Sequence, residues 1–523
     1  MAKAMEKVDV VIVGSGAAGS VFAAVLAEAG KKVLVLERGT ARKLTDLYSS
    51  QIWARRLKWG ASTLVEAGPD SIWYGFNAGH GFGGAAIHHY GVWPRYHPED
   101  FELMSRYGRG LDWPFGYDEL RPYYDQVQTD VGMSGDARKE VWRPAGAGYP
   151  LPPVLVSKHG QVLARGFEKL GKRVAPIPMA VLSQPYDGRP GCIWDGWCDA
   201  GCPTGALANP LVVYLPRAQK AGARLQADAH VTRVLTDGTG KRATGVEYIN
   251  AKGEKVVQPA NAVVLCAFTV ENARILLNSA NDRHPRGLAN RSDTVGRYLM
   301  CHPAVSISGM FDEEMENHLG TTGGQLLCQD AFDKTSDPGG AFGSRQWEIG
   351  LALKTNDLLG IAMTRPDIYG EALHKFMREG ARHMGSMVGV CEDEPLRENR
   401  IELAGEKDKY GAAKARVVYK ISGEGMKLWR TAAKEGVDLF KAAGAREAWP
   451  SPPGGQHIMG GTIMGKDPGK SVLNGAGQAH EVSNLFVGGP SVFPTSSSVN
   501  STFTAHAMAM KSARFMIEHW GKL

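Results

Sequence analysis

The chain has 523 residues, and a length of about 150 residues per domain predicts two or three domains. Its composition, 43% hydrophobic and 22% charged with a net charge of +6, is that of an ordinary soluble globular enzyme. Lys and Arg are scattered among Asp and Glu, and no basic run alternates with aromatic residues. The sequence therefore gives no indication of nucleic-acid binding.

The N-terminal stretch leads directly into a glycine motif and lacks the layout of a signal peptide or a twin-arginine pair. No uncharged apolar stretch of about 18 residues predicts a membrane span. Taken by itself the chain is expected to be cytoplasmic, and a partner carrying a signal could still export it.

A nucleotide-binding pattern begins the chain. Residues 8–13 are rich in valine, as in a buried parallel strand, and residues 20–30 predict a helix that ends at Gly30. A second strand is expected over 32–36, followed by an acidic residue. Glycines at such positions permit the tight turn, the approach of a pyrophosphate and close helix packing, and the acid accepts hydrogen bonds from a ribose. The residues assigned to the dinucleotide are Gly14, Ser15, Gly16, Ala18, Gly19 and Glu37.

A second glycine-rich segment spans 79–90 and includes Gly83, Gly84 and His88. Together with the first motif it resembles the glucose–methanol–choline oxidoreductase family, in which such a segment runs along FAD. The resemblance implies that His88 lines the flavin pocket, with covalent attachment to the flavin as the alternative. It also implies that Val231 packs near the adenine.

The C-terminal region extends the resemblance. Residues 484–494 resemble the family's closing strand and turn, and the helix expected after residue 500 has its start at the flavin. The resemblance assigns Gly489, Ser501 and Thr502 to the cofactor. Residues 263–265 and the helical stretch 271–280 likewise match a returning strand and helix.

The segment 454–465 resembles the family signature around a catalytic histidine, here His457. The second catalytic position is His or Asn in the family and is Asn500 here. Oxidation of a CH–OH group requires removal of the hydroxyl proton while hydride leaves the carbon. A neutral imidazole suits the proton transfer, and an amide can hold the substrate oxygen.

Three of the seven cysteines, Cys192, Cys198 and Cys202, lie in one loop with the spacing C-x5-C-x3-C-P. The spacing leaves three readings open: an iron–sulfur cluster, a zinc site that lacks a nearby fourth ligand, and a disulfide that leaves an odd thiol. Three thiolates suit a three-iron cluster, whereas four irons would need Asp195 or Asp199. The other four cysteines are expected to be buried or partly buried thiols.

The cysteine loop and its flanks, 112–124, 278–281 and 295–303, resemble the catalytic subunits of bacterial FAD-dependent glucose dehydrogenases. The resemblance covers nearly the whole chain except a divergent stretch at about 305–390. It implies a 3Fe–4S cluster on the three cysteines, a multihaem cytochrome c acceptor subunit, and a small chaperone-like subunit that exports the enzyme to the periplasm.

The expected fold is α/β. A discontinuous, Rossmann-like FAD domain is formed by 1–100, 190–305 and 455–523. A substrate domain is formed by 305–455 with part of 100–190, on an antiparallel sheet with helices. Paired strands are expected over 394–420 and a helix over 421–444. The expected activity is oxidation of a sugar, at glucose C1 or pyranoside C3. The alternatives are a non-sugar alcohol and an electron-carrier flavoprotein without its own substrate.

Overall fold

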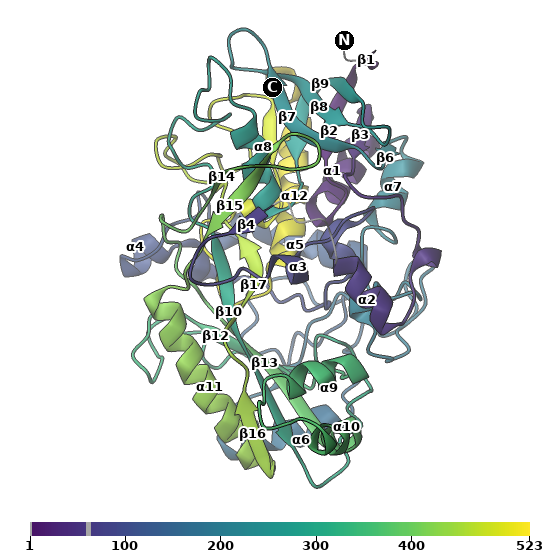
Figure 1. The fold of residues 1–523 in the computed structure, drawn as a ribbon, viewed down its shortest axis with the longest axis vertical. Coiled ribbons are helices and arrows are strands. Elements are labelled where there is room, and N and C mark those ends of the chain that lie inside the picture. The colour runs from purple at the N-terminus through teal and green to yellow at the C-terminus, as the bar shows by residue number, and fades with distance from the viewer. Residues whose placement is uncertain (1–2, 59–63) are drawn as a thin grey trace.

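The computed structural model describes residues 3–58 and 64–523. Within this part of the chain, the largest sheet has eight strands in the order β6-β3-β2-β9-β8-β7, with β1 and β18 also paired to β9. It fills the upper end of the molecule, where both termini lie (Figure 1). The strands are β1 (Lys3–Ala4), β2 (Val8–Val13), β3 (Val33–Leu36), β6 (Arg224–Gln226), β7 (His230–Thr236), β8 (Ala243–Ile249), β9 (Lys255–Leu265) and β18 (Leu485–Val487).

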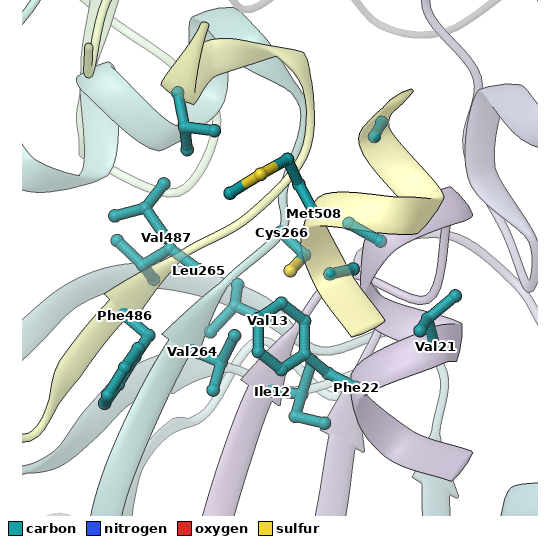
Figure 2. Packing of buried hydrophobic residues seen from close by; sticks show 14 of the residues in the cluster. Ile12, Val13, Val21, Phe22, Val264, Leu265, Cys266, Phe486, Val487 and Met508 are labelled. Carbon is teal, nitrogen blue, oxygen red and sulfur yellow. The ribbon is translucent and has the colours of Figure 1, made fainter. Parts of the chain in front are cut away.

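The predicted nucleotide-binding unit is confirmed in its elements. Strand β2 runs parallel to β3 and β9, and α1 (Ala17–Glu28) crosses between β2 and β3. Apolar residues of β2 and β9 meet α1 and α12 (Ser501–Glu518); Figure 2 shows Val13, Phe22, Leu265 and Met508 in this core. Burying such aliphatic and aromatic side chains stabilises the fold by about 1.5–3 kcal/mol each. The core fixes the carboxyl end of β2, where the glycine motif begins.

A second sheet has seven strands, all antiparallel, in the order β16-β10-β13-β12-β11-β5, with β17 also paired to β10. Its helical cover includes α6 (Lys158–Lys169) and α11 (Gly423–Ala443), which form the lower end in Figure 1. The strands are β5 (Ala175–Pro176), β10 (Met300–Met310), β11 (Leu326–Cys328), β12 (Arg345–Ile349), β13 (Met384–Cys391), β16 (Glu447–Pro450) and β17 (Gly454–Met459).

Strand β12 divides its side chains between two environments, because successive residues of a strand point to opposite faces. Trp347 and Ile349 belong to the apolar core shared with α6 and α11. Gln346 and Glu348 face the opposite way, toward Asn500. One face of the strand therefore supports the domain, and the other reaches the candidate site.

The paired strands predicted over 394–420 are β14 (Arg400–Lys407) and β15 (Ala413–Val418), an antiparallel pair. They form a third sheet with β4 (Leu64–Glu66), which pairs in parallel with β15. The hairpin contacts α8 (Thr269–Asn278) and shares the core of the nucleotide-binding sheet. The hairpin was expected from its sequence, but its partner strand and its place beside α8 come from tertiary packing.

The remaining helices connect these layers. They are α2 (Gln51–Lys58), α3 (Tyr74–Asn77), α4 (Leu103–Tyr107), α5 (Tyr117–Val131), α7 (Tyr214–Lys220), α9 (Thr355–Ala362) and α10 (Glu371–His383). Short 3-10 turns lie at Leu44–Asp46, Gly84–Ile87, Pro98–Phe101, Cys198–Ala200, Pro490–Val492 and Trp520–Lys522. Among the described helices, none combines the length and apolarity needed to cross a bilayer.

Candidate active site

One cavity of about 260 Å³ runs from the carboxyl end of β2 to the face of the second sheet. It brings together most of the residues assigned from the sequence, although they come from widely separated segments of the chain. Those lining it are Gly14, Gly16, Ala18, Glu37, Gly84, His88, Val231, His457, Gly489, Asn500, Ser501 and Thr502. Ser15, Gly19 and Gly83 lie behind this lining and contact it.

The glycine motif is built for close approach. Gly14 has φ +96°, and a Cβ there would lie 2.3 Å from the carbonyl oxygen of Cys266. A Cβ on Gly19 would lie 2.0 Å from the carbonyl oxygen of Gly14. At Gly16 the nearest atom to such a Cβ is 3.7 Å away. Glycine is thus required at positions 14 and 19 by contacts within the protein itself. Gly16 instead leaves room for a ligand at the N-terminus of α1, where backbone N–H groups favour a phosphate.

Glu37 ties the two glycine-rich segments together. Its Oε2 accepts hydrogen bonds from the backbone N–H (3.1 Å) and hydroxyl (2.8 Å) of Ser15. Its Oε1 accepts from the backbone N–H groups of Gly39 (2.9 Å) and Gly81 (3.2 Å). These four bonds use about the whole acceptor capacity of a carboxylate. The bond to a ribose stays a prediction, and the structure adds a role in aligning the loops.

Arg38 is a site residue that the sequence reasoning missed. Its guanidinium lines the cavity beside Glu37, and its buried Nη1 lies 3.5 Å from the Glu271 carboxylate. A guanidinium carries five N–H donors, so one at the cavity wall can also bind an anionic ligand. The cavity therefore fits a polar, phosphate-bearing cofactor, and the only sequence signal was the position directly after the strand-ending acid.

His457 and Asn500 meet at the other end of the cavity, with His457 Nε2 3.4 Å from Asn500 Nδ2. His457 lies in β17 with φ +55°, a left-handed conformation that costs a non-glycine residue about 1–3 kcal/mol. Its backbone N–H donates to Asn77 Oδ1 at 3.1 Å. The strained backbone is held in place so that the ring faces Asn500, at the start of α12.

The protonation of His457 follows from its neighbour His302, which the sequence reasoning did not single out. Burial lowers the pKa of His302 to about 4 and that of His457 to about 3, so both rings are neutral near pH 7. His302 Nε2 lies 3.1 Å from the carbonyl oxygen of Ser496, which can only accept, so Nε2 carries the hydrogen.

The other nitrogen of His302, Nδ1, then holds a lone pair and lies 2.9 Å from His457 Nδ1. His457 must donate from Nδ1, which leaves the lone pair on its Nε2, facing the cavity. The pair thus places a proton acceptor at a defined atom, as neighbours of functional histidines commonly do.

A chain of amides orients Asn500. Gln329 Nε2 donates to Gln346 Oε1 at 2.9 Å, and Gln346 Nε2 donates to Asn500 Oδ1 at 2.9 Å. The Asn500 NH₂ group is therefore turned toward His457 and Glu348, to which it hydrogen-bonds. The sequence reasoning missed Gln346 and Glu348, because they lie in the divergent stretch, where only the alternation of polar residues along a strand could have suggested them.

The three cysteines lie away from the cavity lining but share one apolar environment. All are free thiols; Cys198 is buried, and Cys192 and Cys202 are half-buried beside it. Burial raises the pKa of Cys192 to about 12, and burial followed by the charges of its two neighbours raises that of Cys198 further. Val92 packs in the same cluster and also lines the cavity.

Asp195 and Asp199, the candidate fourth ligands, each interact with other residues. Asp199 forms an ion pair with Lys354 at 3.5 Å, and Asp195 accepts from Ser49 and from the backbone of Trp197. Within residues 3–58 and 64–523, no group of three or more His, Cys, Asp or Glu side chains is arranged to hold a single metal ion. The remaining four cysteines are buried thiols, as predicted.

Comparison with known proteins identifies the family. The N-terminal model of the GMC oxidoreductases matches residues 8–304, and their C-terminal model matches 395–509. The chain therefore belongs to the GMC oxidoreductase family, the glucose–methanol–choline family of the sequence resemblance, whose Rossmann-like domain binds FAD. That fold and that cofactor agree with the glycine motif and the cavity.

Relatives are similar over nearly their whole length. The fructose dehydrogenase large subunit of Gluconobacter japonicus is 30% identical over 97% of both chains. The 2-methyl-1,2-propanediol dehydrogenase of Mycolicibacterium austroafricanum is 31% identical over 99% of this chain and 96% of its own. The gluconate 2-dehydrogenase flavoprotein of Pantoea cypripedii is 28% identical over 100% of this chain and 95% of its own.

Solved structures support the fold. A pyridoxine 4-oxidase from Mesorbium loti superposes with a TM-score of 0.70 at 18% identity, covering 98% of this chain and 100% of that one. A formate oxidase superposes with a TM-score of 0.71 at 15% identity, covering both chains fully. The predicted α/β fold with a Rossmann-like domain is confirmed.

Proposed function

We propose that this GMC oxidoreductase is an FAD-dependent dehydrogenase that oxidises a CH–OH group of a sugar or glycoside, at glucose C1 or pyranoside C3. The observation that carries the proposal is the pair His457 and Asn500, which presents a lone pair and an amide donor at adjacent atoms of the cavity wall. Relatives named for fructose and gluconate dehydrogenation support a sugar-derived substrate.

The geometry suits removal of a hydroxyl proton. A substrate hydroxyl between the two side chains would donate to His457 Nε2 and accept from the Asn500 amide. Because burial holds His457 neutral, its Nε2 accepts the proton as the alcohol is oxidised. Asn500 stabilises the negative charge that develops on the substrate oxygen. A bound flavin supplies the two-electron acceptor for the hydride, and the protein supplies position and electrostatics.

We further propose that Cys192, Cys198 and Cys202 hold a 3Fe–4S cluster, through which electrons leave one at a time. The support is the grouping of three free thiols in one apolar cluster that reaches the cavity wall at Val92. Thiolates are the usual ligands of iron–sulfur clusters, and the three cysteines would hold the cluster and let it pass electrons singly. Metal binding would deprotonate the buried thiols and release protons.

Replacing Cys198 with alanine is expected to reduce cluster iron and acid-labile sulfide to well below one equivalent per chain, because Cys198 is the most buried of the three thiols. The measurement is iron and sulfide analysis of purified protein together with its flavin content. Cys328→Ala, which removes a buried thiol of β11, is the control and should keep the cluster. Equal iron in both variants, or none in the unaltered protein, would contradict the proposal.

The proposed electron acceptor is a multihaem cytochrome c subunit, and the proposed route to the periplasm is export with a small signal-bearing subunit; a cytoplasmic enzyme is the alternative. Relatives named as the large subunit and the flavoprotein of their dehydrogenases support a multi-subunit assembly. Co-expression with such subunits, followed by purification on a tag carried by one of them, tests for a complex.

A second candidate function is oxidation of a non-sugar alcohol, favoured by the relative named for 2-methyl-1,2-propanediol. Anaerobic visible spectra before and after adding glucose, methyl glucoside or 1,2-propanediol separate the two. Bleaching of the flavin bands by a sugar supports the first function, and bleaching by the small diol alone supports the second. If no alcohol bleaches the flavin but a redox protein reduces it, the protein is an electron carrier.

A further inference from the structure

Glu348 is a buried acid that the chemistry above does not use. It lies on β12, lines the cavity together with His457 and Asn500, and is 4% exposed. Within the described part of the chain, no Lys, Arg or His forms an ion pair with it. Its hydrogen-bond partners are Gln346, whose Nε2 donates to Oε1 at 3.3 Å, and the Asn500 amide.

This carboxyl group has acceptor capacity left over. A carboxylate offers about four lone-pair sites, and these two amides use two of them. A buried acid without a cationic partner is costly to keep, so a ligand that hydrogen-bonds it gains substantially. Burial also raises the pKa of Glu348 to about 7, so near neutral pH it is only partly ionised. Its environment of neutral amides suits a hydroxyl better than an ammonium ion.

The position of Glu348 relative to the catalytic pair defines which hydroxyl it can reach. Asn500 bonds to Glu348 and also lies 3.4 Å from His457 Nε2. An alcohol oxygen held between His457 and Asn500 is therefore two hydrogen bonds from the carboxyl group, by way of the Asn500 amide nitrogen. The second oxygen of a vicinal diol lies about one hydrogen-bond length from the first, because adjacent carbons carry them, so it can reach the carboxyl group with a single hydrogen bond.

We propose that Glu348 binds a second hydroxyl group on the carbon next to the one being oxidised, so that the site selects vicinal diols. The inference rests on the proposed oxidation of an alcohol and specifies its substrate class. Sugars carry this arrangement throughout the ring, and so does a small 1,2-diol. Glu348 is then a specificity-determining residue, distinct from the pair that handles the reacting oxygen.

The test compares matched substrates that differ by one hydroxyl. Anaerobic flavin reduction is measured with glucose against 2-deoxyglucose, and with 1,2-propanediol against 1-propanol, for the unaltered protein and for Glu348→Leu. Loss of a hydrogen bond to an acidic group should lower kcat/KM for the diol about 10- to 100-fold and leave the deoxy partner within about 3-fold. The preference for the diol should therefore collapse in the variant.

Gln346→Met is the comparison variant, because it removes the amide that donates to both Asn500 and Glu348 but leaves the carboxyl group itself in place for a substrate hydroxyl. It should slow both members of each pair by the same factor. If Glu348→Leu also slows both members equally, Glu348 only positions Asn500 and the inference is wrong. Faster reduction by glucosamine than by glucose at about pH 7 would also overturn it, because the acid would then be selecting a cation.

The two proposals fail in different ways. If alcohols still bleach the flavin of Glu348→Leu and the variant keeps its preference for the diol, only the role of Glu348 is wrong. A flavin that no member of either pair reduces overturns the proposed oxidation, and this inference with it. Flavin content and melting temperature of each variant show whether the variant has kept its fold.

Discussion

His302→Leu is expected to lower kcat about 100-fold while leaving flavin content unchanged. The imidazole of His302 accepts the Nδ1 hydrogen of His457 at 2.9 Å, and this contact keeps the lone pair of His457 on Nε2. Leucine cannot accept that hydrogen, so His457 loses its defined tautomer. Removing an orienting partner of a functional histidine commonly costs 10- to 100-fold, and general acid–base catalysis contributes about 10²–10⁴-fold in total. Stopped-flow measurement of flavin reduction reports the effect directly.

Two comparisons separate orientation from a simple loss of packing. His302→Gln supplies both an amide oxygen to accept from His457 and an NH₂ group to donate to the Ser496 carbonyl, so it should recover part of the rate. A glutamine variant as slow as the leucine variant, at equal melting temperature, would show that tautomer control is not the role of His302. His457→Ala gives the rate of flavin reduction without this imidazole, with which both variants are compared.

The pH dependence of flavin reduction follows from the same burial. The pKa of His457 is lowered to about 3, first by burial and then by His302. A lowered pKa keeps the proton-accepting form present at every pH above it, and this form is lost only as the pH falls through that value. Imidazole protonation should therefore produce no limb in the pH profile of the unaltered protein between about pH 5 and 9.

Lys334→Met is expected to lower the free energy of unfolding by about 3–5 kcal/mol, because it leaves two buried carboxylates without their cation. The Lys334 ammonium donates to Asp100 at 2.5 Å and to Glu392 at 2.7 Å, and the side chain is wholly buried. Asp100 in turn accepts from the Ser497 hydroxyl at 2.7 Å, three residues before Asn500. Denaturant titration measures the loss, and a fall in activity should accompany it.

Lys434→Met is the matched control. That lysine pairs with Asp438 on the exposed face of α11, with 82% of its side chain accessible, and should change stability by less than about 0.5 kcal/mol. Burial raises the pKa of Asp100 to about 6 even though Lys334 lowers it, so removal of Lys334 raises that pKa further. A raised carboxyl pKa favours the folded state as the pH falls, and the variant therefore gains more from protonation than the unaltered protein does. The deficit of Lys334→Met should thus shrink between pH 7 and pH 5. Equal effects of the two substitutions would contradict the prediction.

The strands and helices next to sequence motifs could be predicted, because the residues that determine them are neighbours in the chain. The valine-rich strand, the glycine turn and the helix after it appear as expected, except that the helix begins at Ala17, three residues before the stretch predicted from its apolar pattern. The hairpin over 394–420 and the helix over 421–444 also form. In each case the residues that predict the element are the residues that form it or their close neighbours in the chain.

The parts of the site that were missed depend on contacts between distant segments. His302 and His457 are 155 residues apart, and Gln346 and Asn500 are 154 apart. The pairing of β10 with β17 places His302 opposite Gln456 and so next to His457. The family resemblance predicted His457 and Asn500, but the groups that orient them are defined only by sheet register and by the hydrogen bond from Gln346 of β12 to Asn500, just before α12.

The alternation along β12 limits how the substrate range of this enzyme can change. Trp347 and Ile349 anchor the strand in the lower core, while Gln346 and Glu348 face Asn500 and the candidate site. A slip of one residue would exchange the two sets, placing a tryptophan in the cavity and a carboxyl group in the core. New specificities should therefore arise by single substitutions at 346 and 348, in evolution or in directed libraries, and an insertion or deletion within this strand should abolish folding before it alters selectivity.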